Sequence, residues 1–427
     1  MNMKDRVILH ADVNSFFASC EEQINPKLKL VPMAVAGNED LRHGIILAKN
    51  QKAKPFGIAT GMVKWEARLR CRNIVFVGAH TDEYREFTRS VRKCMYNYTD
   101  QIEPFGGDEA WLDVTGSARL FGGGYEIAHR LKEDIRRKTG LTASVGVSWN
   151  KAFSKLGSDY KKPDAVTEFN KGNYKEKVWS LPVGSLLFVG RSTTKKLNSI
   201  GVRLIGDLAN TSMGILENNF GKNGLGLWAY ANGLDNSSVC EYGHIEPPKS
   251  IGNSTTTPRD LCSEHDIKQT ISMLADTVAS RMRDEGVRGN VVAIGIRGAK
   301  GLSWFSRQTK LKHATCVSKH ISSAAYDLFL KCDYDWQKES IRSVGVRVTE
   351  LKYIDEFSQT DLFGEEETRY VEEALEFAKD RMRKKYGYDC IRTGLEMWDS
   401  SLPVISPEDA RLKGSGMYEI SNQRRHG

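Results

Sequence analysis

The sequence lacks the features that mark membrane-spanning, secreted and zinc-binding proteins. It has no apolar run of about 18 residues or more, which a membrane-crossing helix needs. Its eight cysteines are scattered, with no CxxC pair and no Cys/His cluster, so neither a disulfide framework nor a zinc site is expected. The first residues lead into a strand-like pattern without a signal-peptide segment. We therefore expect a cytoplasmic protein with reduced thiols and no membrane segment.

Charge is unevenly divided along the chain. The 427 residues carry a formal net charge of +8, but residues 355–427 hold 11 Lys and Arg against 16 Asp and Glu. This tail has a net charge of −5, which leaves +13 for the rest. A basic body favours a polyanionic partner, although a solvated basic surface explains the charge equally well. The length predicts about two to four domains.

Two otherwise apolar strand segments carry carboxylates. Residues 7–14 contain Asp12, and residues 106–114 contain Asp108 and Glu109. An ionised carboxylate is costly to bury unless it is paired or binds a metal. A lone Asp at a strand end is more often a cap, and a lone Asp-Glu pair is more often a surface feature. Together, the two segments favour one site in which all three carboxylates surround divalent cations.

The order of predicted elements indicates an α+β protein. Strands are predicted at residues 6–12, 31–36, 44–48, 74–77 and 142–148, helices at 81–98 and 124–138, and a hairpin at 101–114. The hairpin would present Asp108 and Glu109 just after its turn. This order is typical of a domain built on a split βαβ sheet.

A helical region follows from about residue 181 to 230. Within it, Gly190 and Ser192 belong to a segment similar to a helix-hairpin-helix, in which N–H groups at a helix N-terminus meet a phosphate. Ser192 stands where that motif usually has its second glycine, so an ordinary helix-helix turn is the alternative. Trp149, in the segment before this region, is unusual, and the pattern offers no reason for it.

After a polar linker at 236–248, the pattern is strand, helix, strand, strand, helix, strand up to residue 349. In the predicted strands 341–349 and 290–297, Arg347 and Arg297 alternate with Val and Ile residues. Small and basic residues on an open sheet face allow a nucleic-acid backbone to approach. A solvent-facing sheet side is the alternative.

Several motifs together are similar to those of one family. Residues 9–19 (LHADVNSFFAS) and 107–113 (GDEAWLD) resemble the two palm motifs of the Y-family (translesion) DNA polymerases, and the bacterial DNA polymerase IV (DinB) group matches best. Residues 143–163 resemble the later palm motif, and residues 249–256 resemble the start of the little-finger domain. Only the tail after about residue 365 lies outside the resemblance.

The resemblance implies a multidomain right-hand polymerase with a palm, small fingers, a helical thumb and a βαββαβ little finger. The implied domains are palm 1–20 and 80–177, fingers 21–79, thumb 178–235, linker 236–248, little finger 249–354 and tail 355–427. The implied activity is error-prone, template-directed addition of dNTPs to primer-template DNA during DNA damage tolerance. A UmuC-like catalytic subunit that depends on accessory proteins and a non-catalytic DNA-binding scaffold are the alternatives.

The family's metal site falls on the two acidic strands. Asp12 and Asp108 would bridge two ions, and Glu109 would complete the ion beside the primer 3′-hydroxyl. The backbone carbonyl of Val13 would ligate the ion on the triphosphate side. Two Mg²⁺ ions are expected, because the ligands are hard oxygens and the substrate carries phosphates.

The resemblance also assigns residues to the nucleotide. Phe17 matches the steric gate that excludes a ribose 2′-hydroxyl, and Phe16, beside it, suits the buried helix face better. Lys162 matches a lysine that contacts the triphosphate. Gln51 and Lys54 stand where many members carry Tyr and Arg, and lysine lacks the bidentate fork of arginine. With Gln51 and Lys54 at these two positions, the chain is similar to the UmuC branch of the family.

Further partners are implied by the resemblance. The expected DNA-binding residues are Gly190, Ser192, Arg297, Arg307 and Arg347. Residues 359–363 (QTDLF) are similar to the peptide with which bacterial polymerases dock on the sliding clamp, with Gln359, Leu362 and Phe363 as its contacts, although chance linker sequence is the alternative. We expect a bacterial monomer whose tail holds a charged helix at about 365–386 and a disordered end from about residue 400.

Overall fold

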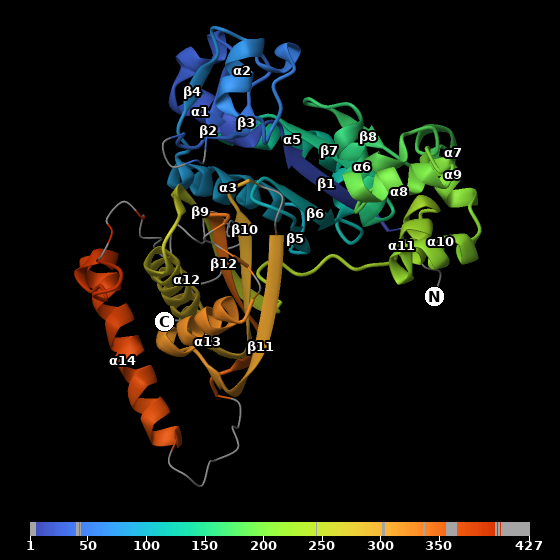
Figure 1. Cartoon of the computed structure of the whole chain (residues 1–427). Helices are drawn as coiled ribbons and strands as arrows, with labels where there is room; N and C mark the ends of the chain where they lie inside the picture. Colours follow the sequence, from blue (N-terminus) through green and yellow to red (C-terminus); the bar gives the residue numbers. More distant parts are fainter. Residues whose placement is uncertain are drawn as a thin grey trace. The chain divides into compact units, whose positions relative to one another are not determined.

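The structure is a computed structural model of the chain, shown in Figure 1. It describes residues 6–39, 42, 44–244, 246–300, 304–332, 334–335, 338–355, 365–397, 399 and 402. The described residues form two compact units, one with residues up to 37 and from 45 to 244, the other with residues 38–44 and from 246 onward. Each unit is described by itself. No described helix combines the length and the apolar character that crossing a bilayer requires.

The first unit contains two sheets and a helical region. Its strands are β1 (Ile8–Val13), β2 (Met33–Ala36), β3 (Ile46–Lys49), β4 (Val75–Val77), β5 (Ile102–Pro104), β6 (Glu109–Asp113), β7 (Ala143–Ser148) and β8 (Val166–Glu168). Its α-helices are α1 (Phe16–Ile24), α2 (Lys64–Arg70), α3 (Thr81–Tyr96), α4 (Ala118–Phe121), α5 (Gly124–Thr139), α6 (Lys151–Tyr160), α7 (Tyr174–Lys177), α8 (Arg191–Ser199), α9 (Ile205–Asn210), α10 (Met213–Phe220) and α11 (Lys222–Ala231). Short 3₁₀ turns are η1 (Pro26–Leu30), η2 (Lys54–Phe56) and η3 (Val183–Ser185). The α+β class predicted from the sequence is confirmed.

A five-stranded sheet lies at the centre of the first unit, with the order β5-β6-β1-β7-β8. β1 pairs antiparallel with both β6 and β7, and β7 pairs parallel with β8. The predicted hairpin is confirmed, since β5 and β6 pair antiparallel across the turn at 105–108. A smaller sheet, in the order β3-β2-β4, packs with α2 around its own apolar cluster.

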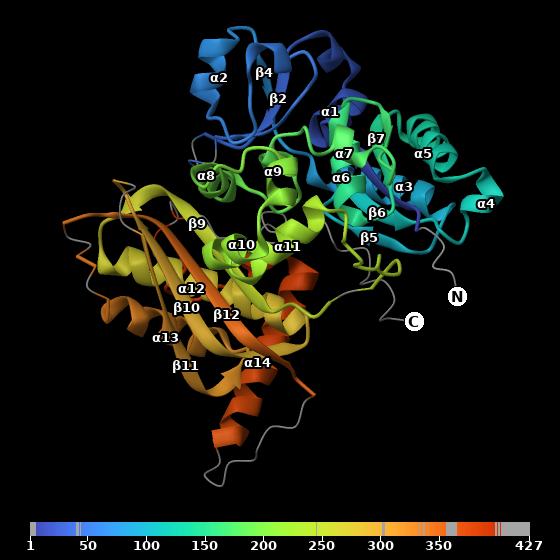
Figure 2. The same ribbon diagram turned by 90° about the vertical axis from the view of Figure 1, so that its right-hand side faces the viewer.

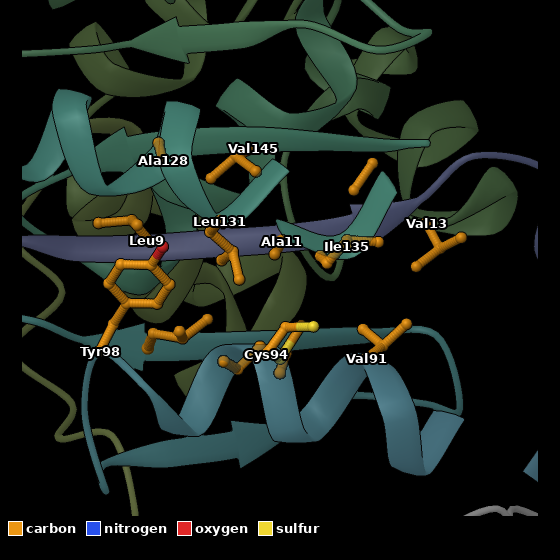
Figure 3. Close-up of a cluster of buried hydrophobic side chains, with 14 of the residues drawn as sticks. Leu9, Ala11, Val13, Val91, Cys94, Tyr98, Ala128, Leu131, Ile135 and Val145 are labelled. Carbon is orange, nitrogen blue, oxygen red and sulfur yellow. The ribbon is translucent and has the colours of Figure 1, made fainter. Parts of the chain in front are cut away.

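Side-chain alternation along β1 gives the large sheet one apolar face and one polar face. Leu9, Ala11 and Val13 point into a core formed with α3 and α5, and this cluster is shown in Figure 3. The intervening His10 and Asp12 therefore point to the opposite face. The apolar face fixes the register, because a shift by one residue would bury the polar set in that core.

Helix α6 covers the polar face of the same sheet, packing on β7 and β1. Gly146 of β7 makes this close approach feasible, because a Cβ there would lie 1.9 Å from the main-chain oxygen of Ser154 on α6. Gly146 is the cross-strand partner of His10. Because Gly146 has no side chain, α6 can lie directly over the polar residues of β1.

The helical region from α7 to α11 shares an apolar cluster with α6. Trp149 contributes to the contact between the helical region and α6. Its indole N–H donates to the carbonyl of Gly233 at 2.9 Å, and its ring packs edge-on against Phe153 and Tyr174. Gly233 has φ +69°, and a Cβ there would lie 2.6 Å from the Trp149 ring. Trp149 therefore fastens the helical region to the start of α6, a role that its sequence motif did not reveal.

The second unit is a four-stranded antiparallel sheet with helices on one face, which Figure 2 shows from the side of the strands. Its elements are β9 (Ser250–Leu261), α12 (Glu264–Asp284), β10 (Val287–Gly298), β11 (Trp304–Thr315), α13 (Ser318–Leu330), β12 (Ile341–Tyr353), α14 (Glu365–Tyr386) and the 3₁₀ turn η4 (Tyr388–Cys390). The order β11-β10-β12-β9 and the predicted strand-helix-strand-strand-helix-strand sequence agree. The charged helix predicted at 365–386 is confirmed as α14.

The strands of this sheet are longer than the sequence predicts. The sequence pattern predicts the first strand of this unit at 249–254, but β9 continues to Leu261 and passes through Pro258. Among the described strands β9 pairs with β12 alone, at the edge of the sheet, and a proline without an N–H is tolerated at an edge.

Candidate active site

Three side chains meet on the polar face of the five-stranded sheet. Asp12 of β1 is the cross-strand partner of Glu109 of β6, so both point to the same side. His10 lies two residues before Asp12 and shares its face. One ligand atom from each of His10, Asp12 and Glu109 lies within 4.8 Å of the others. The predicted union of the two acidic strands is thus present in the fold.

Two lysines hold this group of carboxylates. Lys155 of α6 donates to Asp12 Oδ2 at 3.1 Å and to Glu109 Oε2 at 2.5 Å. Lys162, just after α6, donates to Asp12 Oδ2 at 2.6 Å and pairs with Asp159 at 2.7 Å. Asp12 is 7% exposed, so this compensation takes place largely out of water. A buried carboxylate with such partners is far less costly than one without.

The lysines decide the protonation of Asp12. Burial alone would raise the pKa of Asp12, but the charges of Lys155 and Lys162 outweigh it and hold that pKa below its usual value. Burial alone would lower the pKa of Lys155, but the negative charges of Asp12, Asp159 and Glu109 raise it above its usual value. Asp12 is therefore ionised and Lys155 protonated at neutral pH.

The pKa values of Glu109 and Asp108 are raised, whereas that of Asp12 is lowered. Burial raises the pKa of Glu109 to about 7, against the opposing charge of Lys155. Burial and the negative charge of Asp12 raise the pKa of Asp108 to about 6. Asp108 lies before β6 begins and outside the 4.8 Å group, while its carbonyl accepts a hydrogen bond from the Val13 N–H at 3.1 Å. The predicted bridging role of Asp108 and the predicted role of the Val13 carbonyl stay predictions.

His10 was missed by sequence reasoning. Its side chain is fully buried, and Nδ1 lies 2.9 Å from Ser158 Oγ of α6. Burial, followed by the charge of Lys155, lowers its pKa well below the usual value, so the ring is neutral. Nε2 has no hydrogen-bond partner and lies 3.5 Å from Glu109 Oε2. The available signal was the two-residue spacing from Asp12, which puts both side chains on one face.

The donor set suits a hard divalent cation. Carboxylate and carbonyl oxygens are the ligands that Mg²⁺ prefers, and Asp12, Asp108, Glu109 and Val13 offer only these. The orphaned Nε2 of His10 adds a nitrogen lone pair or a hydrogen-bonding partner next to Glu109. The residues present thus fit the expected metal site.

The predicted gate residue stands on the turn after β1. Ser15, in the left-handed region at φ 50°, turns the chain from β1 into α1. Phe16 then points into the core at 4% exposure, as its buried-face interpretation expects. The ring of the partly buried Phe17 stacks on Tyr84 of α3, with centroids 4.6 Å apart and planes 14° from parallel. The Tyr84 hydroxyl donates to the buried Glu21 at 2.5 Å, which fixes the ring beneath Phe17.

Two of the predicted phosphate-binding residues, Lys54 and Lys162, carry positive charge near each other. Burial, followed by the charges of Lys49 and Lys162, lowers the pKa of Lys54. Gln51 is exposed in the same loop. The buried Asn50 holds this loop, because its Oδ1 accepts from the main-chain N–H groups of Met33 at 3.1 Å and Ala53 at 3.0 Å.

The predicted thumb contact lies at a helix N-terminus. Gly190 is the N-cap residue of α8, and Ser192 is exposed in its first turn. A surface pocket at this end is lined by Gly184, Val189, Gly190, Arg191, Thr194, Lys195 and Asn198. Unpaired N–H groups and two basic side chains make this a suitable place for a phosphate.

The three arginines that the sequence analysis lists on the second unit's sheet lie on different faces, because of the strand register. Arg297 and Arg347 are exposed, and they lie opposite to the strand residues that face α12 and α13. Arg307 is the cross-strand partner of Ile294, which is fully buried on the helix side. Alternation therefore turns the Arg307 side chain toward the other face, and its predicted DNA contact stays a prediction. Trp304, 65% exposed, lies over Gly295 on the open face and was not predicted.

The predicted clamp contacts Gln359, Leu362 and Phe363 lie outside the described residues, as does most of the end predicted to be disordered. Clamp binding stays a prediction from the sequence.

Comparison with known proteins agrees with this site and fold. Residues 11–159 match the model of the impB/mucB/samB family, residues 248–362 match its C-terminal domain, and residues 185–235 match a model described as the DNA polymerase-iota thumb domain. DNA polymerase IV of Acetivibrio thermocellus is 45% identical over 400 residues, or 94% of this chain and 100% of that protein. DNA polymerase IV of Moorella thermoacetica is 36% identical over 398 residues, covering 93% and 98%.

Among solved structures, a Y-family DNA polymerase chimera of Dbh and Dpo4 matches with a TM-score of 0.70 at 22% identity, covering 81% of this chain and 99% of that one. Its fold is therefore shared. The chain belongs to the Y-family of DNA polymerases, in the DNA polymerase IV group. It is accordingly a DNA-directed DNA polymerase of the translesion class, and this is favoured over a UmuC-like subunit or a non-catalytic scaffold.

Protons and metal ions should compete for the acidic cluster. With pKa values of about 6 for Asp108 and about 7 for Glu109, both carboxyls are partly protonated in mildly acidic solution, and a bound ion must displace those protons. We expect the affinity of the DNA-free protein for Mn²⁺ to rise by up to about tenfold per pH unit per displaced proton, then to level off above about pH 7. Electron paramagnetic resonance of free Mn²⁺ measures this. An affinity that does not change with pH would contradict it, and Glu109→Gln should remove the upper part of the slope.

Proposed function

We propose that the chain extends a primer by two-metal phosphoryl transfer at the cluster of Asp12, Asp108 and Glu109. The observation that supports this most is the cross-strand pairing of Asp12 with Glu109, together with the ammonium groups of Lys155 and Lys162 against them. Two divalent ions held there, Mg²⁺ by preference, would activate the primer 3′-hydroxyl and neutralise the triphosphate.

The chain's own residues have positioning and charge-balancing roles in this proposal. Lys54 and Lys162 hold the triphosphate of the incoming dNTP, and Gln51 adds a hydrogen bond. Phosphoryl transfer depends mainly on such positioning and on charge stabilisation. The second unit's open sheet face, with Arg297 and Arg347, holds the template-primer backbone, as does the N-terminus of α8.

Primer extension by the purified chain tests the assignment. Asp108→Ala should lower extension with Mg²⁺ roughly a thousandfold or more, because a ligand aimed at the reacting phosphate is lost. Asp82→Asn, which removes an exposed carboxylate on α3, should leave extension unchanged. Normal extension by Asp108→Ala would refute the site. If the unaltered chain extends only after accessory proteins are added, the UmuC-like alternative is correct.

Sugar selection tests the gate. Phe17→Ala should raise the ratio of ribonucleotide to deoxyribonucleotide incorporation by roughly tenfold or more, because space opens beside the nucleotide 2′ position. Phe87→Ala is the matched control, since Phe87 is another partly buried ring on the same core cluster. Single-nucleotide kinetics with rNTP and dNTP give the ratio. An unchanged ratio in Phe17→Ala would exclude this role.

Salt-dependent DNA binding tests the open face of the second unit's sheet. Arg347→Ala should weaken primer-template binding and lower the magnitude of the salt slope by about one, because one phosphate contact is lost. Arg307→Ala removes the same charge from the other face, where its guanidinium donates to the Ser306 carbonyl at 3.1 Å. It should change the slope less. Fluorescence-anisotropy titrations measure both slopes. If Arg347→Ala and Arg307→Ala lower the affinity and the salt slope equally, the open face of the sheet is not the DNA-binding face.

A further inference from the structure

Tyr84 of α3 contacts helix α1 at two points. Its ring stacks on Phe17, with centroids 4.6 Å apart and planes 14° from parallel. Its hydroxyl donates to Glu21 Oε1 at 2.5 Å. Phe17 and Glu21 are four residues apart and are therefore neighbours on one face of α1. The ring that supports Phe17 is thus fixed by the same helix that carries Phe17.

The carboxylate of Glu21 is itself held in place. Glu21 is 1% exposed, and a carboxylate buried to this extent needs partners. A second partner is His80, whose Nδ1 lies 2.8 Å from the same Oε1 atom. The hydrogen bond and the charge of Glu21 raise the pKa of His80, which favours the protonated imidazole beside the carboxylate. His80 is the N-cap residue of α3, one turn before Tyr84, so both partners come from the start of one helix.

The bond to Glu21 limits how far the Tyr84 ring can tilt. The ring is 1% exposed and also packs near Phe16, with centroids 6.2 Å apart. Packing alone leaves a ring some freedom to tilt, whereas a directional hydrogen bond at the hydroxyl fixes its far end. Because Phe17 is stacked on this ring, the orientation of Phe17 depends on it.

A second buried tyrosine on the same core shows what is particular to Tyr84. Tyr98 is 7% exposed and donates to Asp134 Oδ2 at 2.7 Å, which makes the same kind of pair. Its ring packs against Phe121, with planes 58° apart. A tyrosine–carboxylate pair therefore also occurs here as a structural contact, whereas the pair at Glu21 carries a predicted nucleotide contact on its ring.

We propose that Glu21 is a positioning residue for sugar selection. It holds the Tyr84 ring against Phe17, and thereby keeps the Phe17 ring beside the 2′ position of the incoming nucleotide. Glu21 acts through Tyr84 rather than by touching the nucleotide. This proposal rests on the gate role proposed above for Phe17, and it extends the determinants of sugar selection to a buried carboxylate behind the gate.

Single-nucleotide kinetics with rNTP and dNTP test this role. Tyr84→Phe keeps the ring and removes only its hydroxyl, so it should raise the ratio of ribonucleotide to deoxyribonucleotide incorporation about fivefold, the effect of one lost hydrogen bond. Tyr98→Phe is the matched control, because it removes the corresponding hydroxyl from Asp134, and it should leave the ratio unchanged. A purely structural role of Tyr84 would lower both rates together without changing their ratio.

Two substitutions of Glu21 test whether it acts through this bond. Glu21→Gln keeps an oxygen that can accept from Tyr84, so its ratio should stay close to that of the unaltered chain. Glu21→Met has no such acceptor, and its ratio should rise as much as that of Tyr84→Phe. Combining Glu21→Met with Tyr84→Phe should add nothing further, because both changes remove the same bond. Circular dichroism verifies that each variant is folded.

Phe17→Ala, measured in the same assay, separates this inference from the gate on which it rests. If Phe17→Ala raises the ratio but Tyr84→Phe and Glu21→Met do not, the gate stands and the role of Glu21 is overturned. If Phe17→Ala also leaves the ratio unchanged, the gate itself is refuted, and the role of Glu21 with it. Additive effects of Glu21→Met and Tyr84→Phe would overturn the role of Glu21 as well, because the two residues would then act separately.

Discussion

The compensation of buried carboxylates by lysine ammonium groups is the constraint on which the first unit's site depends. Asp12 and Glu109 are brought side by side by strand register, and their like charges would repel if nothing offset them. Lys155 offsets both at once. It can do so because Gly146 lets α6 lie close on the polar face of the sheet. A side chain at position 146 would push away the helix that carries the compensating charge.

This arrangement also suits a site that must accept cations. The three carboxyl groups differ in protonation. Lys155 and Lys162 keep Asp12 ionised, whereas burial raises the pKa values of Asp108 and Glu109. A divalent ion would supply the positive charge that the lysines alone do not provide for all three. The neutral His10, wedged between Ser158 and Glu109, adds a polar group without adding charge.

Local sequence patterns predicted much of the fold, including the two acidic strands that pair in it. Alternation along β1 and the hairpin before Glu109 were readable because each depends on a few neighbouring residues. The face on which Arg307 lies could not be predicted, since it depends on the register with β10. The roles of His10 and Trp149 depend on Ser158 and Gly233, which are distant in sequence.

Helix α14 illustrates the same limit in another form. The sequence predicted its bounds, and a surface helix normally turns its apolar side inward. Forked arginine pairs to Glu373 and Asp380 instead turn that side outward. The inward side of a helix is therefore decided by partners that a local pattern does not contain.

Thermal unfolding of Lys155→Met at pH 8, above the raised pKa of Glu109, tests the central claim most directly. Without divalent ions, the variant should lose about 3 kcal/mol of stability, because two largely buried carboxylates lose their shared counter-charge. Saturating Mg²⁺ should restore most of that loss and stabilise the variant more than the unaltered chain. A variant that unfolds at the unaltered temperature without metal, or that gains nothing from Mg²⁺, would show that lysine and metal charges do not substitute for each other at this site.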